Sequence, residues 1–98
     1  MIKITGQSLI AGNWIAPKGE DFQSFNPYTR ESMHGFASCG ADEIELATRA
    51  AKEAFQDYRN LDGKTIGHFL NTIADEIEAL GDQLLEVCDS ETGLGLVR

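Results

Sequence analysis

The sequence has few basic residues. Eight Lys and Arg stand against sixteen Asp and Glu in 98 residues, so the formal net charge is -8. A field of this sign repels phosphate backbones and anionic lipid headgroups, which argues against nucleic acid as a partner. Apolar residues make up 42% of the chain, a share that is typical of folded rather than disordered proteins. The composition therefore predicts an acidic folded chain, limited by its length to one small domain or part of one.

Long apolar runs are also missing. The longest, such as residues 9–11 and 84–85, fall far short of the roughly 20 residues that a membrane-spanning helix needs. The first twelve residues lack both the apolar core and the small-residue cleavage site of a secretory signal. We therefore expect no membrane segment and a cytoplasmic location.

Cysteine and histidine are scarce, with two of each. Cys39 and Cys88 have no CxxC spacing, and His34 and His68 do not complete a metal-binding pattern, so we predict free thiols and no metal site. A nucleophilic cysteine needs a base and an electropositive setting. We expect Cys88 to be buried on an apolar helix face and Cys39 to lie in a glycine-flanked connection without a base. No catalytic residue is predicted.

Residues 1–40 consist of short apolar runs separated by turn residues. The pattern predicts strands near residues 8–11, 13–16 and 22–25, with a further strand over 32–38. Gly12 and Asn13 suit a primed hairpin turn, which would place Trp14 beside the preceding strand. Pro27 restricts Asn26 to an extended or turning conformation.

From Gly40 onward the apolar period changes from two to about 3.6 residues, as amphipathic helices require. Gly40 is the predicted N-cap of a first helix, and Gly81 and Gly93 are the predicted ends of a second and a third. Asp82 is a candidate cap for the third helix. The apolar positions of the first two helices are Ile44, Ala47, Ala51, Ala54, Phe55 and Tyr58, then Ile66, Phe69, Leu70, Ile73, Ala74, Ile77 and Leu80. The predicted fold is therefore α+β: a β-hairpin and short strands, followed by three helices of antiparallel type.

The sequence Gly93-Leu94-Gly95 raises the possibility of a phosphate-binding loop. A dinucleotide-binding G-x-G-x-x-G must follow a strand and open a helix. Here the glycines follow a helix, and Arg98 occupies the place of the third glycine. We therefore expect a helix C-terminus followed by a turn. The preceding Ser90 resembles the attachment serine of an acyl carrier protein, but only eight residues follow it, so we expect an ordinary serine near a helix end.

Five short segments occur in an order that is informative as a set. They are Ile10-Ala11-Gly12-Asn13-Trp14-Ile15, then Phe25-Asn26-Pro27-Tyr28-Thr29, then residues 41–55 with their Ala-x-x-Ala-Ala-x-x-Ala-Phe spacing, then Phe69-Leu70-x-x-Ile73-Ala74-Asp75-x-Ile77, and Glu91-Thr92-Gly93. Together they resemble the N-terminal region of the aldehyde dehydrogenase superfamily. Residues 73–80 and 91–94 are most similar to bacterial alpha-ketoglutaric semialdehyde (2,5-dioxovalerate) dehydrogenases. Two positions depart from the family pattern: Ile66, where Arg is common, and Gly95, where Pro is common.

The resemblance implies that the chain is a structural segment of a longer α/β oxidoreductase, which oxidises an aldehyde to a carboxylate with NAD or NADP. By the same resemblance, the catalytic thiol, the general-base Glu, the oxyanion Asn and the cofactor turn lie beyond Arg98, and none is assigned to Cys39 or Cys88. Residues 1–98 would then be one partial domain, with strands and turns over 1–40 and helices over 41–98, belonging to the cofactor-binding domain. We expect such a segment to be inactive alone and to bind no cofactor. Its expected partners are the remainder of the aldehyde dehydrogenase chain and further copies, through exposed apolar surface.

A protein of another class fits the same sequence: an independent acidic helical module that docks partners through an apolar stripe. Such a module is expected to fold as a closed, cooperative monomer. The enzyme segment is instead expected to leave a hydrophobic face uncovered. The sequence leaves open which aldehyde is oxidised and whether NAD or NADP is used.

Overall fold

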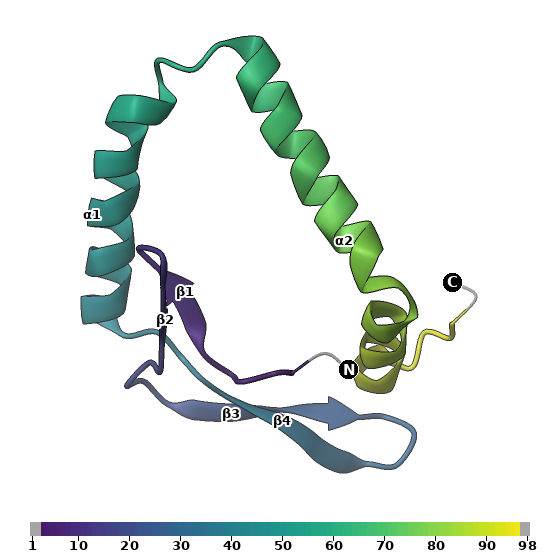
Figure 1. Cartoon of the computed structure of the whole chain (residues 1–98). Helices are drawn as coiled ribbons and strands as arrows, with labels where there is room; N and C mark the ends of the chain where they lie inside the picture. Colours follow the sequence, from purple (N-terminus) through teal and green to yellow (C-terminus); the bar gives the residue numbers. More distant parts are fainter. Residues whose placement is uncertain (1–2, 97–98) are drawn as a thin grey trace. The chain divides into compact units, whose positions relative to one another are not determined.

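The computed structural model describes residues 3–96 and contains short strands followed by helices (Figure 1). In chain order the elements are β1 (Ser8–Ile10), β2 (Asn13–Ile15), β3 (Asp21–Asn26), β4 (Glu31–Ala37), α1 (Ala41–Tyr58) and α2 (Gly63–Thr92). The strands pair as two small sheets, β1 with β2 and β3 with β4. The predicted order of strands before helices is confirmed, and each strand begins and ends within a residue or so of its predicted range.

The β1–β2 hairpin is antiparallel, and its turn is one residue earlier than the sequence predicts. The paired residues are Ser8 with Ile15, Leu9 with Trp14, and Ile10 with Asn13. The turn is therefore Ala11-Gly12, with φ angles of 52° and 78°, as a primed two-residue turn requires. The predicted corner at Gly12-Asn13 is wrong because Asn13 joins the ladder. The expected position of Trp14 beside β1 is confirmed.

The turn between β3 and β4 is held by one asparagine side chain. Asn26 Oδ1 accepts hydrogen bonds from the amides of Tyr28, at 2.8 Å, and Thr29, at 3.3 Å. The Arg30 amide also donates to the Asn26 carbonyl at 2.8 Å. In such an asparagine turn the side-chain oxygen accepts from backbone amides that a sharp reversal leaves without a carbonyl partner. The residues around Pro27 therefore form a fixed loop at the end of the β3–β4 hairpin.

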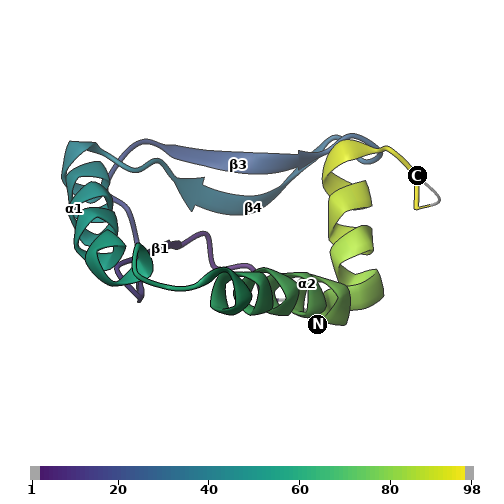
Figure 2. The same cartoon turned by 90° about the horizontal axis from the view of Figure 1, so that it is seen from above.

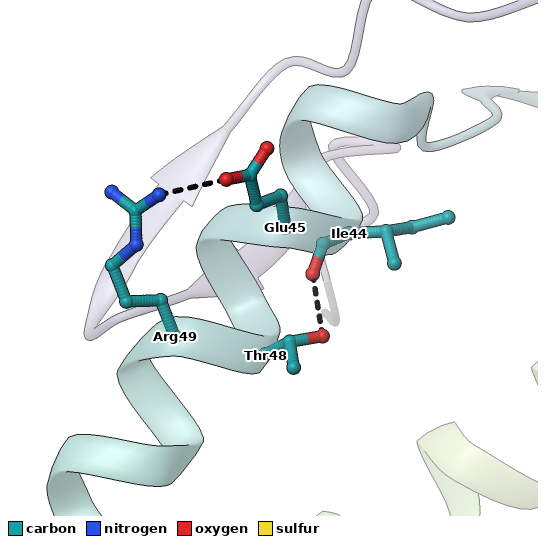
Figure 3. Close-up of polar contacts among 4 residues, drawn as sticks. All are labelled: Ile44, Glu45, Thr48 and Arg49. Carbon is teal, nitrogen blue, oxygen red and sulfur yellow. Dashed lines mark hydrogen bonds and ion pairs between the residues drawn. The ribbon is translucent and has the colours of Figure 1, made fainter.

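Helix α1 begins after Gly40, as predicted, and ends at Tyr58. Gly40 is extended and its carbonyl accepts from the amide of Ile44 at 3.1 Å, but it provides no side-chain cap. On the exposed side of the helix, Arg49 forms an ion pair with Glu45 at 2.8 Å, one turn away (Figure 3). Both side chains are more than 60% exposed, so solvent screens the pair and it adds little stability.

Helix α2 begins after Asp62, whose side chain accepts from the Thr65 amide at 2.8 Å. The helix includes a non-helical residue, Gly81, with φ 57° and ψ -139°, and its axis changes direction sharply there (Figures 1 and 2). The predicted third helix is wrong, because residues 3–96 form two helices. Gly81 bends the chain without a separating loop, so the segment from Asp82 to Thr92 continues α2.

The chain divides into two compact units. One comprises Ile4–Ser24 and Ser32–Asn60, and the other combines Phe25–Glu31 with the segment from Leu61 onward. Burial is slight: among residues 3–96, Ile10, at 7% exposed, and Pro17 are the buried residues. Within its unit, α1 lies against β1. Most large apolar side chains of both helices are therefore left at the surface.

Candidate functional site

The candidate reactive side chains are divided between the two units, His34 and Cys39 in one and His68 and Cys88 in the other. Cys39 is exposed, with Sγ 3.5 Å from the Ser8 hydroxyl. Cys88 is also exposed, so its predicted burial is wrong: it borders an open hollow between the end of α2 and residues 94–96. His34 is half-buried and His68 is exposed. Within residues 3–96 there is no group of three His, Cys, Asp or Glu side chains that could hold a metal ion.

The Ser90 hydroxyl is engaged within its own helix. It donates to the Glu86 carbonyl at 2.9 Å, a bond that serine commonly makes one turn back in a helix. Thr92 makes the same kind of bond to the Cys88 carbonyl at 2.7 Å. These contacts are what an ordinary hydroxyl near a helix end makes.

The glycines after α2 use their amides locally. Gly93 has φ 68° and donates to the Asp89 carbonyl at 2.7 Å, so it ends the helix as predicted. The Leu94 amide donates to the Thr92 hydroxyl at 3.3 Å, and the Gly95 amide to Asp89 Oδ1 at 2.7 Å. A phosphate loop must point its amides at the ligand. All three amides are occupied here, so this segment does not fit the pyrophosphate of a dinucleotide.

One carboxylate connects three segments of the same unit. Asp89 Oδ1 accepts from the Tyr28 hydroxyl at 2.8 Å and also from the Gly95 amide. The hydrogen bond to Asp89 raises the pKa of Tyr28 above its ordinary value, with smaller contributions from burial and from the carboxylate charge. The sequence does not predict this contact, because its two side chains are 61 positions apart. The residues around each of them form no pattern that indicates the other as a partner.

The same end of α2 lies close to the β3–β4 turn. A Cβ atom added at Gly93 would lie 3.0 Å from Pro27 Cγ, a distance closer than ordinary van der Waals contact. Glycine at position 93 therefore permits two things: the left-handed conformation that ends the helix, and the close approach of Pro27. The turn, the helix end and the chain that follows the helix meet at this point.

In the other unit, a glutamate near the start of α1 holds a loop. Glu43 Oε1 accepts from the Lys18 amide at 2.7 Å. This bond is the main reason that the pKa of Glu43 lies below its ordinary value. The contact orders the connection between β2 and β3.

The remaining candidate is an apolar surface on α2. Phe69, Ile73, Ile77 and Leu80, which we call the α2 stripe, recur every three or four residues and are 41–53% exposed. Three of them border a shallow hollow of about 360 Å³. An amphipathic helix is stabilised mainly by packing of its apolar face. The α2 stripe therefore has the character of a surface that another polypeptide covers.

Among the helices of residues 3–96, neither is long and apolar enough to cross a bilayer.

Comparison with known proteins identifies the family. The aldehyde dehydrogenase family model matches residues 14–97, which is most of the chain. This chain belongs to the aldehyde dehydrogenase family. The resemblance inferred from the sequence is thus confirmed.

Several relatives of the family match nearly the whole chain. It is 34% identical over 99 residues to alpha-ketoglutaric semialdehyde dehydrogenase 2 of Azospirillum brasilense, covering 99% of this chain and 19% of that protein. The alpha-ketoglutaric semialdehyde dehydrogenase of Acinetobacter baylyi is also 34% identical, with 100% and 19% covered. The N-succinylglutamate 5-semialdehyde dehydrogenase of Vibrio cholerae is 31% identical over 84 residues, with 86% and 17% covered. The chain thus spans about a fifth of the length of the aldehyde dehydrogenases that it matches.

Proposed function

We propose that this chain is the N-terminal structural segment of an NAD(P)-dependent aldehyde dehydrogenase and has no catalytic activity alone. The observation that carries the proposal is that its relatives match it along its whole length but are about five times as long. Their names suggest a semialdehyde, possessing both an aldehyde and a carboxylate, as the substrate of the complete enzyme. Oxidation of the aldehyde to a carboxylate would take place on residues outside this chain, in the cytoplasm.

The structural role that we propose is to form part of the cofactor-binding domain. Two features support it. The Gly93–Gly95 amides are already bonded within the chain, so the segment supports a domain without itself cradling the cofactor. The α2 stripe is exposed, so it is available to pack against the remainder of an aldehyde dehydrogenase or, in its absence, against another copy.

An assay of NAD and NADP reduction by the purified chain tests the catalytic part of the proposal. Absorbance at 340 nm is followed with succinic semialdehyde and alpha-ketoglutaric semialdehyde as substrates. We expect no rate above that of buffer. Turnover that disappears in Cys39→Ser or Cys88→Ser would show that a thiol of this chain is catalytic and would overturn the proposal.

The alternative, an independent acidic interaction module, predicts a closed monomer with a cooperative thermal transition. We expect light scattering to give a mass above that of the monomer, because exposed apolar stripes associate in water. Ile77→Asp should shift the chain toward monomer, whereas Ala79→Asp, the same charge placed off the stripe on the same helix, should not. A monomeric parent chain with a sharp thermal transition would favour the module.

A further inference from the structure

The contacts of Asp89 suggest a function that neither the family comparison nor the proposed role includes. The carboxylate lies one turn before the end of α2 and accepts two hydrogen bonds on the same oxygen. One donor comes from the β3–β4 turn and the other from the chain beyond the helix. A charged acceptor makes shorter and stronger hydrogen bonds than a neutral one, and both of these are short, at 2.8 and 2.7 Å.

Each of the two donors is held by its own local structure. Tyr28 belongs to the turn that Asn26 fixes through the amides of residues 28 and 29, so its hydroxyl is presented from a preorganised loop. Gly95 has φ 89°, a left-handed conformation that only glycine adopts at low cost. The path of the chain leaving α2 therefore depends on a conformation that Gly95 takes while bonded to Asp89.

We propose that Asp89 is a positioning residue that couples the β3–β4 turn to the chain leaving α2, so that the Tyr28 hydroxyl helps to set the direction of residues 94–96. The physical basis is rotamer restriction. With both donors present, Asp89 Oδ1 accepts two hydrogen bonds, and the oxygen that accepts from Gly95 stays in place. Without the Tyr28 hydroxyl the side chain regains rotational freedom, and the Gly95 bond weakens although Tyr28 never touches Gly95.

Amide hydrogen exchange followed by mass spectrometry tests this coupling in the full 98-residue chain. The peptide containing Gly95 is compared with a peptide from α1 as an internal reference, in the parent chain and in Tyr28→Phe. We expect exchange at Gly95 to accelerate several-fold in Tyr28→Phe while α1 is unchanged. The matched control is Tyr58→Phe, which removes the other phenol hydroxyl and should leave Gly95 exchange as in the parent.

A spectroscopic measurement separates positioning by the carboxylate from a general structural effect. The titration of Tyr28 is followed by NMR in the parent and in Asp89→Asn. Because the hydrogen bond to Asp89 is the main cause of the raised pKa of Tyr28, we expect that pKa to fall toward its ordinary value in the variant.

Two results would overturn the proposal. If Gly95 exchange in Tyr28→Phe equals that of the parent, the two hydrogen bonds are independent. If exchange accelerates equally at Gly95 and throughout α1, the substitution destabilises the whole chain and Asp89 has no positioning role. The coupling does not depend on catalysis by a longer enzyme, so the aldehyde assay can fail or succeed without deciding it.

Discussion

Replacement of Gly81 by alanine should straighten α2. At Gly81 the backbone has φ 57° and ψ -139°, outside the regions that residues with a Cβ populate. An alanine held there costs about 1–3 kcal/mol. In a continuous helix, alanine is instead favoured over glycine by about 1 kcal/mol. The two effects act in the same direction and shift the equilibrium toward the straight form by about 2–4 kcal/mol relative to the parent chain, or by roughly 30- to 900-fold in the population ratio.

The straight and bent forms differ in the distance between the two parts of α2. Spin labels at Lys64→Cys and Glu86→Cys, in a chain with Cys39→Ser and Cys88→Ser, would lie about 33 Å apart along a straight helix at 1.5 Å per residue. The bent helix of the parent brings them closer. Double electron–electron resonance measures this separation directly, and the fraction of the longer distance gives the population of the straight form.

Gly67→Ala is the matched control. Gly67 also lies in α2, but a Cβ there meets open space and its φ is not left-handed. This substitution should therefore increase helix stability without changing the distance. If Gly81→Ala gives the same distance as the parent, or a broad distribution instead of a longer distance, the reasoning that a glycine-only conformation maintains the bend is refuted.

Three further predictions concern the turns, the end of α2 and pH. Ala11→Asn should stabilise the chain by about 1 kcal/mol, seen as a rise in thermal midpoint, because asparagine tolerates φ 52° better than alanine; Ala16→Asn, outside the turn, should give no gain. Gly93→Ala should cost about 1–2 kcal/mol in chemical unfolding, since φ 68° disfavours a Cβ, and equal stability would contradict this. Hydrogen bonds lower the pKa of Asp62 below its ordinary value of 3.8 and that of Glu43 below its ordinary value of 4.5. The two carboxylates therefore stabilise the folded chain fully at a pH above these ordinary values, and this stabilisation is lost as the pH falls through their lower pKa values in the folded chain. Thermal unfolding across this acid range should be less pH-dependent in Asp62→Asn, and an unchanged slope would be evidence against the effect.

The helix boundaries were predictable because their signals are local. Gly40, Asp62 and Gly93 lie where the helices begin and end, and each acts through atoms within about four residues. Gly81 was predicted to end a helix, and this is wrong, because Gly81 bends α2 without ending it. Whether a glycine ends a helix or bends it depends on what the following residues pack against, and a single sequence does not contain that information.

The burial of Cys88 and the contact between Tyr28 and Asp89 were not predictable for a different reason. Periodicity states which side of a helix is apolar, but not whether anything covers it, so Cys88 was expected to be buried and is exposed. The Tyr28 hydroxyl and Asp89 belong to the same compact unit but are 61 positions apart in the chain. No periodicity or motif in the sequence links a tyrosine in one turn to an aspartate in a distant helix.

The exposed apolar stripe links the sequence pattern to the proposed role. In proteins most of the stability of an amphipathic helix comes from packing of its apolar face, yet the α2 stripe is about half exposed. The spacing of Phe69, Ile73, Ile77 and Leu80 therefore specifies contacts that the described part of the chain does not make. Relatives about five times as long contain polypeptide that could make them. If Ile77→Asp abolishes self-association and Ala79→Asp does not, the stripe is a surface that binds another polypeptide, as the proposed role requires. If both variants behave alike, the apolar spacing serves the isolated helix only, and the structural role must be located elsewhere in the chain.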